Sequence, residues 1–385
     1  MKLDDLLKHP SLTLPKNWKI LGYPSYYACV VNESSNFLNL LEELDDDVCY
    51  GKGEFIGNLT KDKLVSTAYH FRLMTINALQ SYLNKGNPHE TYNIIDEGLK
   101  AGITNVIKER NKDSDYKPPL FYLEFENLYP EHYRLREKQG TADLGDLFHV
   151  PFECRHNIAS SRYSIPGYPT LYLSNSIFLA YKELREPEYD NLFVSKFRYT
   201  EYNNRTETLL DLTNRPHRET PEFKFKFLAR WVLIMACSIE VGFPDSPFKP
   251  EYILPQILLQ WVKKNINIGD RKVIGVTYSS TKIVGSHKGF YGYFYNTAIP
   301  IHSSNKEGYC SMLSKQFCMT QPISFHKALE YEHEVSIQGQ VKTIEINGAS
   351  VDYVKTDFGK IEQVLSETPH SELYYVNGKR LNPLI

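Results

Sequence analysis

Residues 148–185 read FHVPFECRHNIASSRYSIPGYPTLYLSNSIFLAYKELR, and the local patterns in this stretch set the fold class. The Pro-Gly pair at 166–167 favours a turn, in which Gly167 can adopt a positive φ. Residues 169–174 (PTLYLS) then have the composition of a strand, and residues 176–185 that of a short helix. The stretch therefore predicts a turn, a strand and a helix in close succession.

The segments on either side of this stretch also alternate between strand-like and helix-like patterns. Strands are predicted at 192–199, 272–278 and 292–301, helices at 223–242, 252–264 and 360–366, and a hairpin at 334–354. Asn347-Gly348, inside the hairpin, is the sharpest turn signal in the chain. This mixture of helices and strands, without repeats, indicates an α+β fold rather than a helix bundle or a β-sandwich.

The first 118 residues are predicted to form a mainly helical region. Residues 63–85 and 91–108 have broadly amphipathic patterns, whereas residues 1–60 are mixed because three prolines interrupt any long element. The charged, proline-ended stretch 111–119 has the composition of a linker. The sequence thus predicts three parts, namely a helical N-terminal region (1–118), a central domain (119–325) and a C-terminal β-hairpin extension (326–385).

Composition excludes several classes of function. Apolar residues make up 42% and charged residues 23% of the 385 residues, as in an ordinary soluble globular protein. A net charge of −2 gives no general attraction to nucleic acid or to an anionic membrane. The most apolar stretch, 227–243, contains Arg230 and Glu240 and is too short to cross a bilayer. Because the N-terminus has no apolar signal region and the six cysteines form no CxxC pair, we expect a cytoplasmic protein without a metal site.

The side chains of stretch 148–185 have the chemistry of a ligand site. The chain contains no phosphate-binding loop and no GxGxxG, HExxH or GxSxG motif. A guanidinium such as that of Arg162 matches a phosphate, and an aromatic side chain such as Tyr172 packs on a flat ring. A carboxylate such as Glu183 stabilises an oxocarbenium-like transition state beside a ribose. Arg–Glu pairs are more often surface ion pairs, so residue types alone leave both interpretations open.

The order of residues over a longer part of the chain resembles the signature of the RES-domain family, which is named for its Arg, Glu and Ser. The first strand of that signature carries an aromatic residue followed by Arg, which corresponds here to Tyr133-Arg134. Arg136 is an alternative for this first Arg, because residues two apart in a strand share a face. The second Arg of the signature precedes a Pro-Gly pair and corresponds to Arg162.

The remaining letters of the signature follow in the same order. A Tyr in the next strand corresponds to Tyr172, and a Glu about ten residues later corresponds to Glu183. The Ser lies in a strand that reads GVTYSS, where it corresponds to Ser280, with Ser279 as the near alternative. An Asn in the next strand corresponds to Asn296. The match covers roughly residues 130–302, and it leaves residues 1–120 and the last sixty without a counterpart.

The resemblance implies a fold similar to that of ADP-ribosyltransferases, in which a split, mostly antiparallel sheet binds NAD in a central cleft. RES proteins degrade NAD, and characterised kinds use inorganic phosphate as the acceptor and release nicotinamide and ADP-ribose-1″-phosphate. Many are toxins that a partner antitoxin with a helix-turn-helix region neutralises. The resemblance therefore implies an NAD-consuming toxin or phage-defence effector, with NAD and phosphate as substrates and no permanently bound cofactor.

The resemblance also implies roles for the matching residues. The catalytic candidates are Arg134, Arg162, Tyr172, Glu183 and Ser280, and the NAD-binding candidates are Tyr133, Arg136, Ser279 and Asn296. The first and second arginines would hold the pyrophosphate or the attacking phosphate, and the tyrosine of the second strand would pack on nicotinamide. The glutamate would orient the ribose and support the developing cation, with neutral hydrogen bonds from the serine and the asparagine.

Two other functions stay open on the sequence. The same cleft could transfer ADP-ribose to a macromolecular acceptor, or the chain could be a non-catalytic module that recognises a nucleotide or a partner. The sequence does not decide between a monomer and a homodimer, nor does it identify an antitoxin.

Overall fold

The chain divides into two compact units, which are described separately. The computed structural model describes residues 1–45, 52–53, 57–100, 123–128, 131–200, 207–215, 220–268, 271–283, 294–303, 305–331, 343–346, 349–376 and 380–384. The helical unit comprises Met1–Phe125 and Leu210–Lys264, and the sheet unit comprises Glu126–Leu209 and Asn265–Ile385. The chain passes between them within β3 (Glu124–Asn127), within β7 (Glu207–Leu212) and after Lys264.

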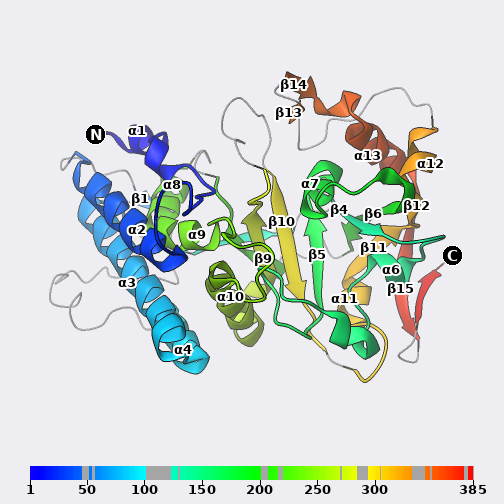
Figure 1. Ribbon diagram of the computed structural model, residues 1–385, viewed down its shortest axis with the longest axis horizontal. Helices are drawn as coiled ribbons and strands as arrows, with labels where there is room; N and C mark the ends of the chain where they lie inside the picture. Colours follow the sequence, from blue (N-terminus) through cyan, green and yellow to red (C-terminus); the bar gives the residue numbers. More distant parts are fainter. Residues whose placement is uncertain are drawn as a thin grey trace. The chain divides into compact units, whose positions relative to one another are not determined.

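The helical unit is built from helices of both its chain segments (Figure 1). They are α1 (Leu3–Leu7), α2 (Tyr26–Glu42), α3 (Lys61–Lys85), α4 (Pro88–Lys100), α8 (Pro221–Ala229), α9 (Trp231–Cys237) and α10 (Ile253–Lys264), with 3-10 turns at Pro10–Leu12 and Pro250–Tyr252 and the strand pair β1 (Lys52–Gly53) and β2 (Gly57–Asn58). Helix α3 begins after Thr60, whose side chain caps it, and is terminated by Gly86, which follows it with a φ of 62°. Trp261 of α10 donates to Asp96 of α4 over 2.9 Å.

The sheet unit contains a large antiparallel sheet. In spatial order its strands are β16 (Arg380–Leu384), β15 (His370–Val376), β11 (Phe317–Thr320), β6 (Leu192–Tyr199), β4 (Glu131–Glu137), β5 (Thr170–Ser174), β10 (Tyr295–Pro300) and β9 (Arg271–Ser279), followed by β7 and β3. Every neighbouring pair from β16 to β9 is antiparallel. The short strands β12 (Ile323–Ser324) and β8 (Asn267–Ile268) pair with β6 and β9. The α+β class with a mostly antiparallel sheet is therefore confirmed.

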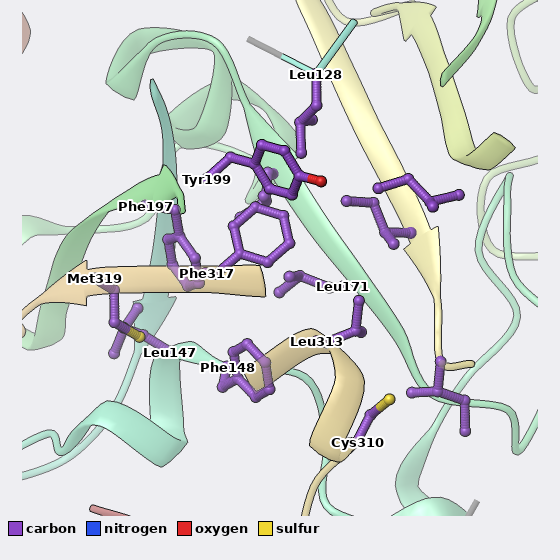
Figure 2. Close-up of a cluster of buried hydrophobic side chains, with 14 of the residues drawn as sticks. Leu128, Leu147, Phe148, Leu171, Phe197, Tyr199, Cys310, Leu313, Phe317 and Met319 are labelled. Carbon is purple, nitrogen blue, oxygen red and sulfur yellow. The ribbon is translucent and has the colours of Figure 1, made fainter. Parts of the chain in front are cut away.

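Two apolar clusters cover the two faces of this sheet. One cluster joins Leu171 and Phe197 to α6 (Leu144–Leu147) and α11 (Ser311–Gln316), as Figure 2 shows. The other joins Leu135 to α7 (Ile177–Glu183), α12 (Phe325–Leu329), α13 (Asp357–Glu367) and the hairpin β13 (Thr343–Ile346) with β14 (Ala349–Asp352). Three 3-10 turns complete the unit, at Phe152–Asn157, Tyr189–Asn191 and Tyr353–Lys355. Burial of both faces explains why most strand residues here are apolar rather than alternating.

The sheet is weakly joined between β4 and β5. Their register contains a single residue pair, Tyr133 with Ser174, whereas β4 pairs with β6 along its whole length. Strands that pair at one position diverge beyond it, so side chains near this point can leave the plane of the sheet. This junction lies at the centre of the RES-like residues.

The local predictions agree with the structure more closely than the long-range ones. The predicted strand 192–199 matches β6, and helices 63–85 and 252–264 match α3 and α10 within two residues. The hairpin of the C-terminal region is present, although its Asn347-Gly348 turn lies outside the described residues, as does the predicted linker 111–119. The predicted helix 223–242 is instead two helices separated at Arg230.

The N-terminal prolines do not prevent a long helix. Helix α2 has 17 residues, and the prediction that residues 1–60 lack a long element is wrong. All three prolines precede its first residue, Tyr26, and Ser25 caps it with a side-chain bond to the Ala28 amide. A proline breaks a helix only when it lies within it, so the prolines mark where α2 begins rather than forbid it.

The two units also divide the chain differently from the three predicted parts. Residues 210–264, predicted within a central domain 119–325, belong to the helical unit, and residues 326–385, predicted as an extension, belong to the sheet unit. The strand β15 joins the main sheet through β11. The reason is that an amphipathic pattern shows that a segment has a buried face but does not show which partner covers it. The predicted boundary at 118 lies outside the described residues.

Gly167 is expected to be required by the turn ahead of β5. Its φ is 72°, and a Cβ added there would meet only the Arg155 carbonyl at 3.9 Å, so the backbone conformation rather than space limits the residue type. We expect Gly167→Ala to lower the free energy of unfolding by roughly 1–2 kcal/mol in urea titrations. Gly167→Asn is expected to lose less, because asparagine tolerates this conformation better. Equal losses in the two variants would contradict this explanation.

Candidate active site

The RES-like glutamate lies at the end of a short helix. Helix α7 begins after Ser176, whose side chain caps it, and ends at Glu183. The Glu183 Oε1 atom accepts hydrogen bonds from Ser280 Oγ and from Asn296 Nδ2, each over 2.7 Å. These three residues are 113 positions apart at most, and they come from a helix, from the end of β9 and from β10. The structure therefore brings Glu183, Ser280 and Asn296 into direct contact.

The two donors to this carboxylate are themselves fixed. Ser174 Oγ donates to Asn296 Oδ1 over 2.6 Å, which orients the amide so that its nitrogen faces Glu183. The Lys282 amide donates to Ser280 Oγ over 3.0 Å, which leaves the hydroxyl proton for the carboxylate. These hydrogen bonds hold the Glu183 carboxylate in one place.

The carboxylate is presented to solvent although its donors are buried. Glu183 is exposed, whereas Ser280 is 6% and Asn296 3% exposed. Among the described residues, hydrogen bonds from other side chains reach only Oε1 of Glu183 and leave Oε2 open. One oxygen is therefore used to position the group, and the other can face a bound molecule.

Arg162 lies next to this cluster. It is 9% exposed, and its Nη2 donates to Thr281 Oγ1 over 3.4 Å, one residue after Ser280. The adjacent Tyr163 packs against Tyr278, with ring centroids 4.1 Å apart and an interplanar angle of 31°. This contact fixes the loop that carries Arg162 against β9.

Arg134 is a partly buried cation on β4. Its register with Ser195 of β6 places it on the sheet face opposite Tyr133, and therefore opposite Ser174 and Asn296, so in β4 it does not share the face that carries the donors to Glu183. Burial, with a smaller contribution from Arg136, lowers the pKa of Arg134 to about 10, whereas the nearby Tyr172 acts in the opposite direction. The Nη1 atom is buried and has no hydrogen-bond partner among the described residues. A buried guanidinium donor in this state favours an anionic ligand.

The remaining predicted residues lie at the edge of the arrangement. Arg136 Nη1 donates to the Asp146 carbonyl over 2.7 Å, so this arginine has a structural partner. Tyr133 is 7% exposed and packs in the apolar cluster beneath α7. Ser279 pairs with Tyr295 and thus faces away from the sheet side that carries Asn296. Of the two serines, Ser280 is the one that contacts the glutamate.

Two residues of the arrangement were not among the predicted candidates. Ser174 orients Asn296, and Tyr278 pairs with Asn296 in the register of β9 and β10 and so shares its face. Strand alternation contains a signal for the first, because Ser174 lies two residues after Tyr172. Tyr278 belongs to the GVTYSS motif, where it served only to locate the serine.

Comparison with known proteins gives a relative that carries a functional name. The chain is similar to a protein of Bacillus subtilis (strain 168) named "Putative toxin YopC". They are 30% identical over 305 residues, which cover 74% of this chain and 66% of that protein. The chain therefore spans slightly less than two thirds of the length of this relative. No family model matches the chain, and no solved structure matches it.

Two further observations concern metal ions and membranes. Among the described residues, no group of three or more histidine, cysteine, aspartate or glutamate side chains is arranged to hold a metal ion. In the same part of the chain, none of the helices is both long and apolar enough to cross a bilayer.

Proposed function

We propose that the sheet unit binds NAD and breaks its nicotinamide–ribose bond, with phosphate as the acceptor, and that the protein acts as a toxin or defence effector. The observation that carries the proposal is the Glu183 carboxylate, which is exposed and is fixed by Ser280 and Asn296. Its order in the sequence relative to Arg134 and Arg162 supports the same assignment. The toxin role is supported by the similarity to the Bacillus subtilis protein.

The proposed chemistry needs a fixed negative charge more than it needs a nucleophilic side chain. When the bond between ribose C1″ and the nicotinamide nitrogen breaks, its electron pair stays on nitrogen and converts the cationic ring to neutral nicotinamide. No acid is required to protonate this leaving group. Positive charge develops on the ribose, where the Glu183 carboxylate stabilises it, and a phosphate oxygen then forms the new bond to C1″. The fixed hydrogen bonds of Glu183 mean that little reorganisation accompanies the reaction.

The arginines supply the complementary charge. Arg134 offers a buried donor without a partner among the described residues, and Arg162 lies beside the Ser280 loop. Either can hold the pyrophosphate of NAD or the incoming phosphate, because guanidinium donors match both anions. Tyr172 lies near Arg134 and is the candidate for packing on nicotinamide.

Product analysis tests the proposal. The purified chain incubated with NAD and phosphate is expected to release nicotinamide and ADP-ribose-1″-phosphate, and its expression is expected to deplete cellular NAD. Arg162→Ala should lower kcat/KM roughly 10- to 100-fold, as expected for a charged hydrogen bond, whereas the exposed Arg198→Ala should not.

Other products would redirect or overturn the proposal. Free ADP-ribose would identify water as the acceptor, and labelled macromolecules would identify an ADP-ribosyltransferase. Binding of NAD without any product would favour a non-catalytic recognition module. Unchanged NAD, both in cells and in the purified reaction, would contradict the enzymatic assignment. An inhibitory partner, such as an antitoxin, is best sought by co-purification from the native host.

A further inference from the structure

The helix that carries Glu183 has too few residues to be stable alone. Helix α7 has seven residues, fewer than an isolated helix needs in water, so its position depends on what packs against it. Phe178 contacts Phe358 of α13 with ring centroids 5.3 Å apart, and Tyr181 contacts the same ring at 5.2 Å. Part of the apolar support of α7 therefore comes from the C-terminal part of the chain, outside the RES-like residues 130–302, in addition to that of the sheet beneath it.

Polar contacts fix the first turn of α7 to the same C-terminal part. The Ile177 amide donates to Glu362 Oε1 over 2.7 Å, and the Phe178 amide donates to the Tyr353 hydroxyl over 3.4 Å. Tyr353 in turn donates to the same Glu362 oxygen. Glu362 Oε1 thus accepts hydrogen bonds from the Ile177 amide and from the Tyr353 hydroxyl. This hydroxyl in turn accepts a hydrogen bond from the Phe178 amide. These amides have no partner within the helix, so the contacts determine where α7 begins.

We infer that Glu362 of α13 is a positioning residue for Glu183, which it reaches through the hydrogen-bonded first turn of α7. This inference rests on the proposed function, because it gives Glu362 a role in the reaction assigned to Glu183. Over seven residues a helix behaves as one rigid body, so a shift at its first turn displaces its last residue. A displacement on the order of 1 Å is enough to reduce catalysis strongly.

The surroundings of Glu362 make its charge sensitive to pH near neutrality. Burial raises the pKa of Glu362 to about 7, against the opposing effects of Tyr353, of the Ile177 amide and of Lys196 on β6. Glu131 on β4 raises the pKa further, and Lys196 forms an ion pair with it over 2.7 Å. The neighbouring Tyr133 hydroxyl also faces this group, because Glu362 raises its pKa. Protonation would weaken both hydrogen bonds that the carboxylate accepts.

Two variants and a control test the inference. Glu362→Ala is expected to lower kcat for NAD cleavage about tenfold with a smaller change in KM. Glu362→Gln keeps an acceptor oxygen, so it should retain more activity than Glu362→Ala. The wild type is expected to lose kcat as pH falls through about 7, and Glu362→Gln should not show this decline. Glu330→Gln, at an exposed glutamate of the same unit, should behave as wild type. In a Glu183→Gln background, Glu362→Ala should cause little further loss.

A measurement without NAD separates this inference from the proposed function. Amide hydrogen exchange of residues 177–183 should become at least tenfold faster in Glu362→Ala than in Glu330→Gln. Unchanged exchange in α7 would overturn the inference whether or not the protein cleaves NAD. If the wild type cleaves NAD, an unchanged kcat and pH profile in both Glu362 variants would overturn it as well. A wild type without NAD cleavage, but with faster α7 exchange in Glu362→Ala, would overturn the proposed function and restrict Glu362 to anchoring the helix.

Discussion

Replacing Glu183 by glutamine is expected to reduce the rate of NAD cleavage on the order of 100- to 1,000-fold, the range found when one preorganised electrostatic contact is removed. The substitution is nearly isosteric. The amide oxygen of glutamine can still accept from Ser280 and Asn296, which now bond Oε1 over 2.7 Å each. What disappears is the negative charge that would face the ribose. The loss should therefore appear in kcat rather than in the stability of the fold.

The control for this substitution is Glu186→Gln. Glu186 is exposed, lies three residues beyond Glu183, and forms a surface ion pair with Lys182 over 2.8 Å. Such pairs contribute little, so activity should change by less than about twofold. Nicotinamide release is the measurement, with urea titrations to verify that each variant is folded. If Glu183→Gln retained wild-type kcat, the carboxylate would not stabilise the reacting ribose, and another group would have to.

The sequence predicted which residues form the cluster around Glu183 better than it predicted the contacts between them. The resemblance placed Glu183, Ser280 and Asn296 in one site, and in the structure both Ser280 and Asn296 donate hydrogen bonds to Glu183. It left Ser279 and Ser280 as alternatives, because adjacent residues at the end of a strand differ only in the face to which they point. The register of β9 with β10 distinguishes them, and register is a long-range property that no local pattern contains.

The pair Arg134 and Arg136 shows a second limit of sequence reasoning. Two residues apart in β4, they share a face, so alternation cannot separate them. The two arginines differ in their hydrogen-bond partners, which come from parts of the chain outside β4. Arg136 donates to the Asp146 carbonyl, whereas Nη1 of Arg134 is buried without a partner in the described part of the chain. The same holds for α13, whose support of α7 could not be expected from its own amphipathic pattern.

Acidification from pH 7 to pH 4 is expected to destabilise the sheet unit through two buried histidines. Burial lowers the pKa of His132 to about 4 and that of His149 to about 4, against 6.5 in the unfolded chain. Between these values the unfolded chain binds more protons than the folded one. The contribution of each histidine to the free energy of unfolding is therefore fully present above pH 6.5. It is lost as pH decreases towards 4, by up to about 3 kcal/mol for each histidine.

The imidazole rings of His149 and His132 differ in their hydrogen bonds, and this difference makes His132 the better residue to replace in a test. His149 donates from Nδ1 to the Val150 carbonyl and accepts at Nε2 from the Cys310 amide, each over 2.8 Å, so replacing it would also break structural bonds. His132 Nδ1 is buried without a hydrogen-bond partner in the described part of the chain, and Nε2 has only a long contact of 3.4 Å with Thr297. His132→Phe keeps most of the ring volume and removes the titrating group at a small structural cost.

Urea titrations of the wild type and His132→Phe at pH 7 and pH 4.5, followed by circular dichroism, measure the effect. Carboxylates also lose favourable contacts in this range, so the informative quantity is the difference between the two proteins in their loss of stability on acidification. That loss should be smaller in His132→Phe by about 2 kcal/mol, whereas the exposed His89→Gln should leave it unchanged. Equal losses in all three proteins would mean that His132 is hydrated in solution or that the unit opens before its ring is protonated. Since Arg134 lies two residues after His132 on the same face of β4, opening of this strand at low pH should also abolish NAD cleavage. Cleavage that persists below the pH at which the strand opens would exclude Arg134 from the reaction.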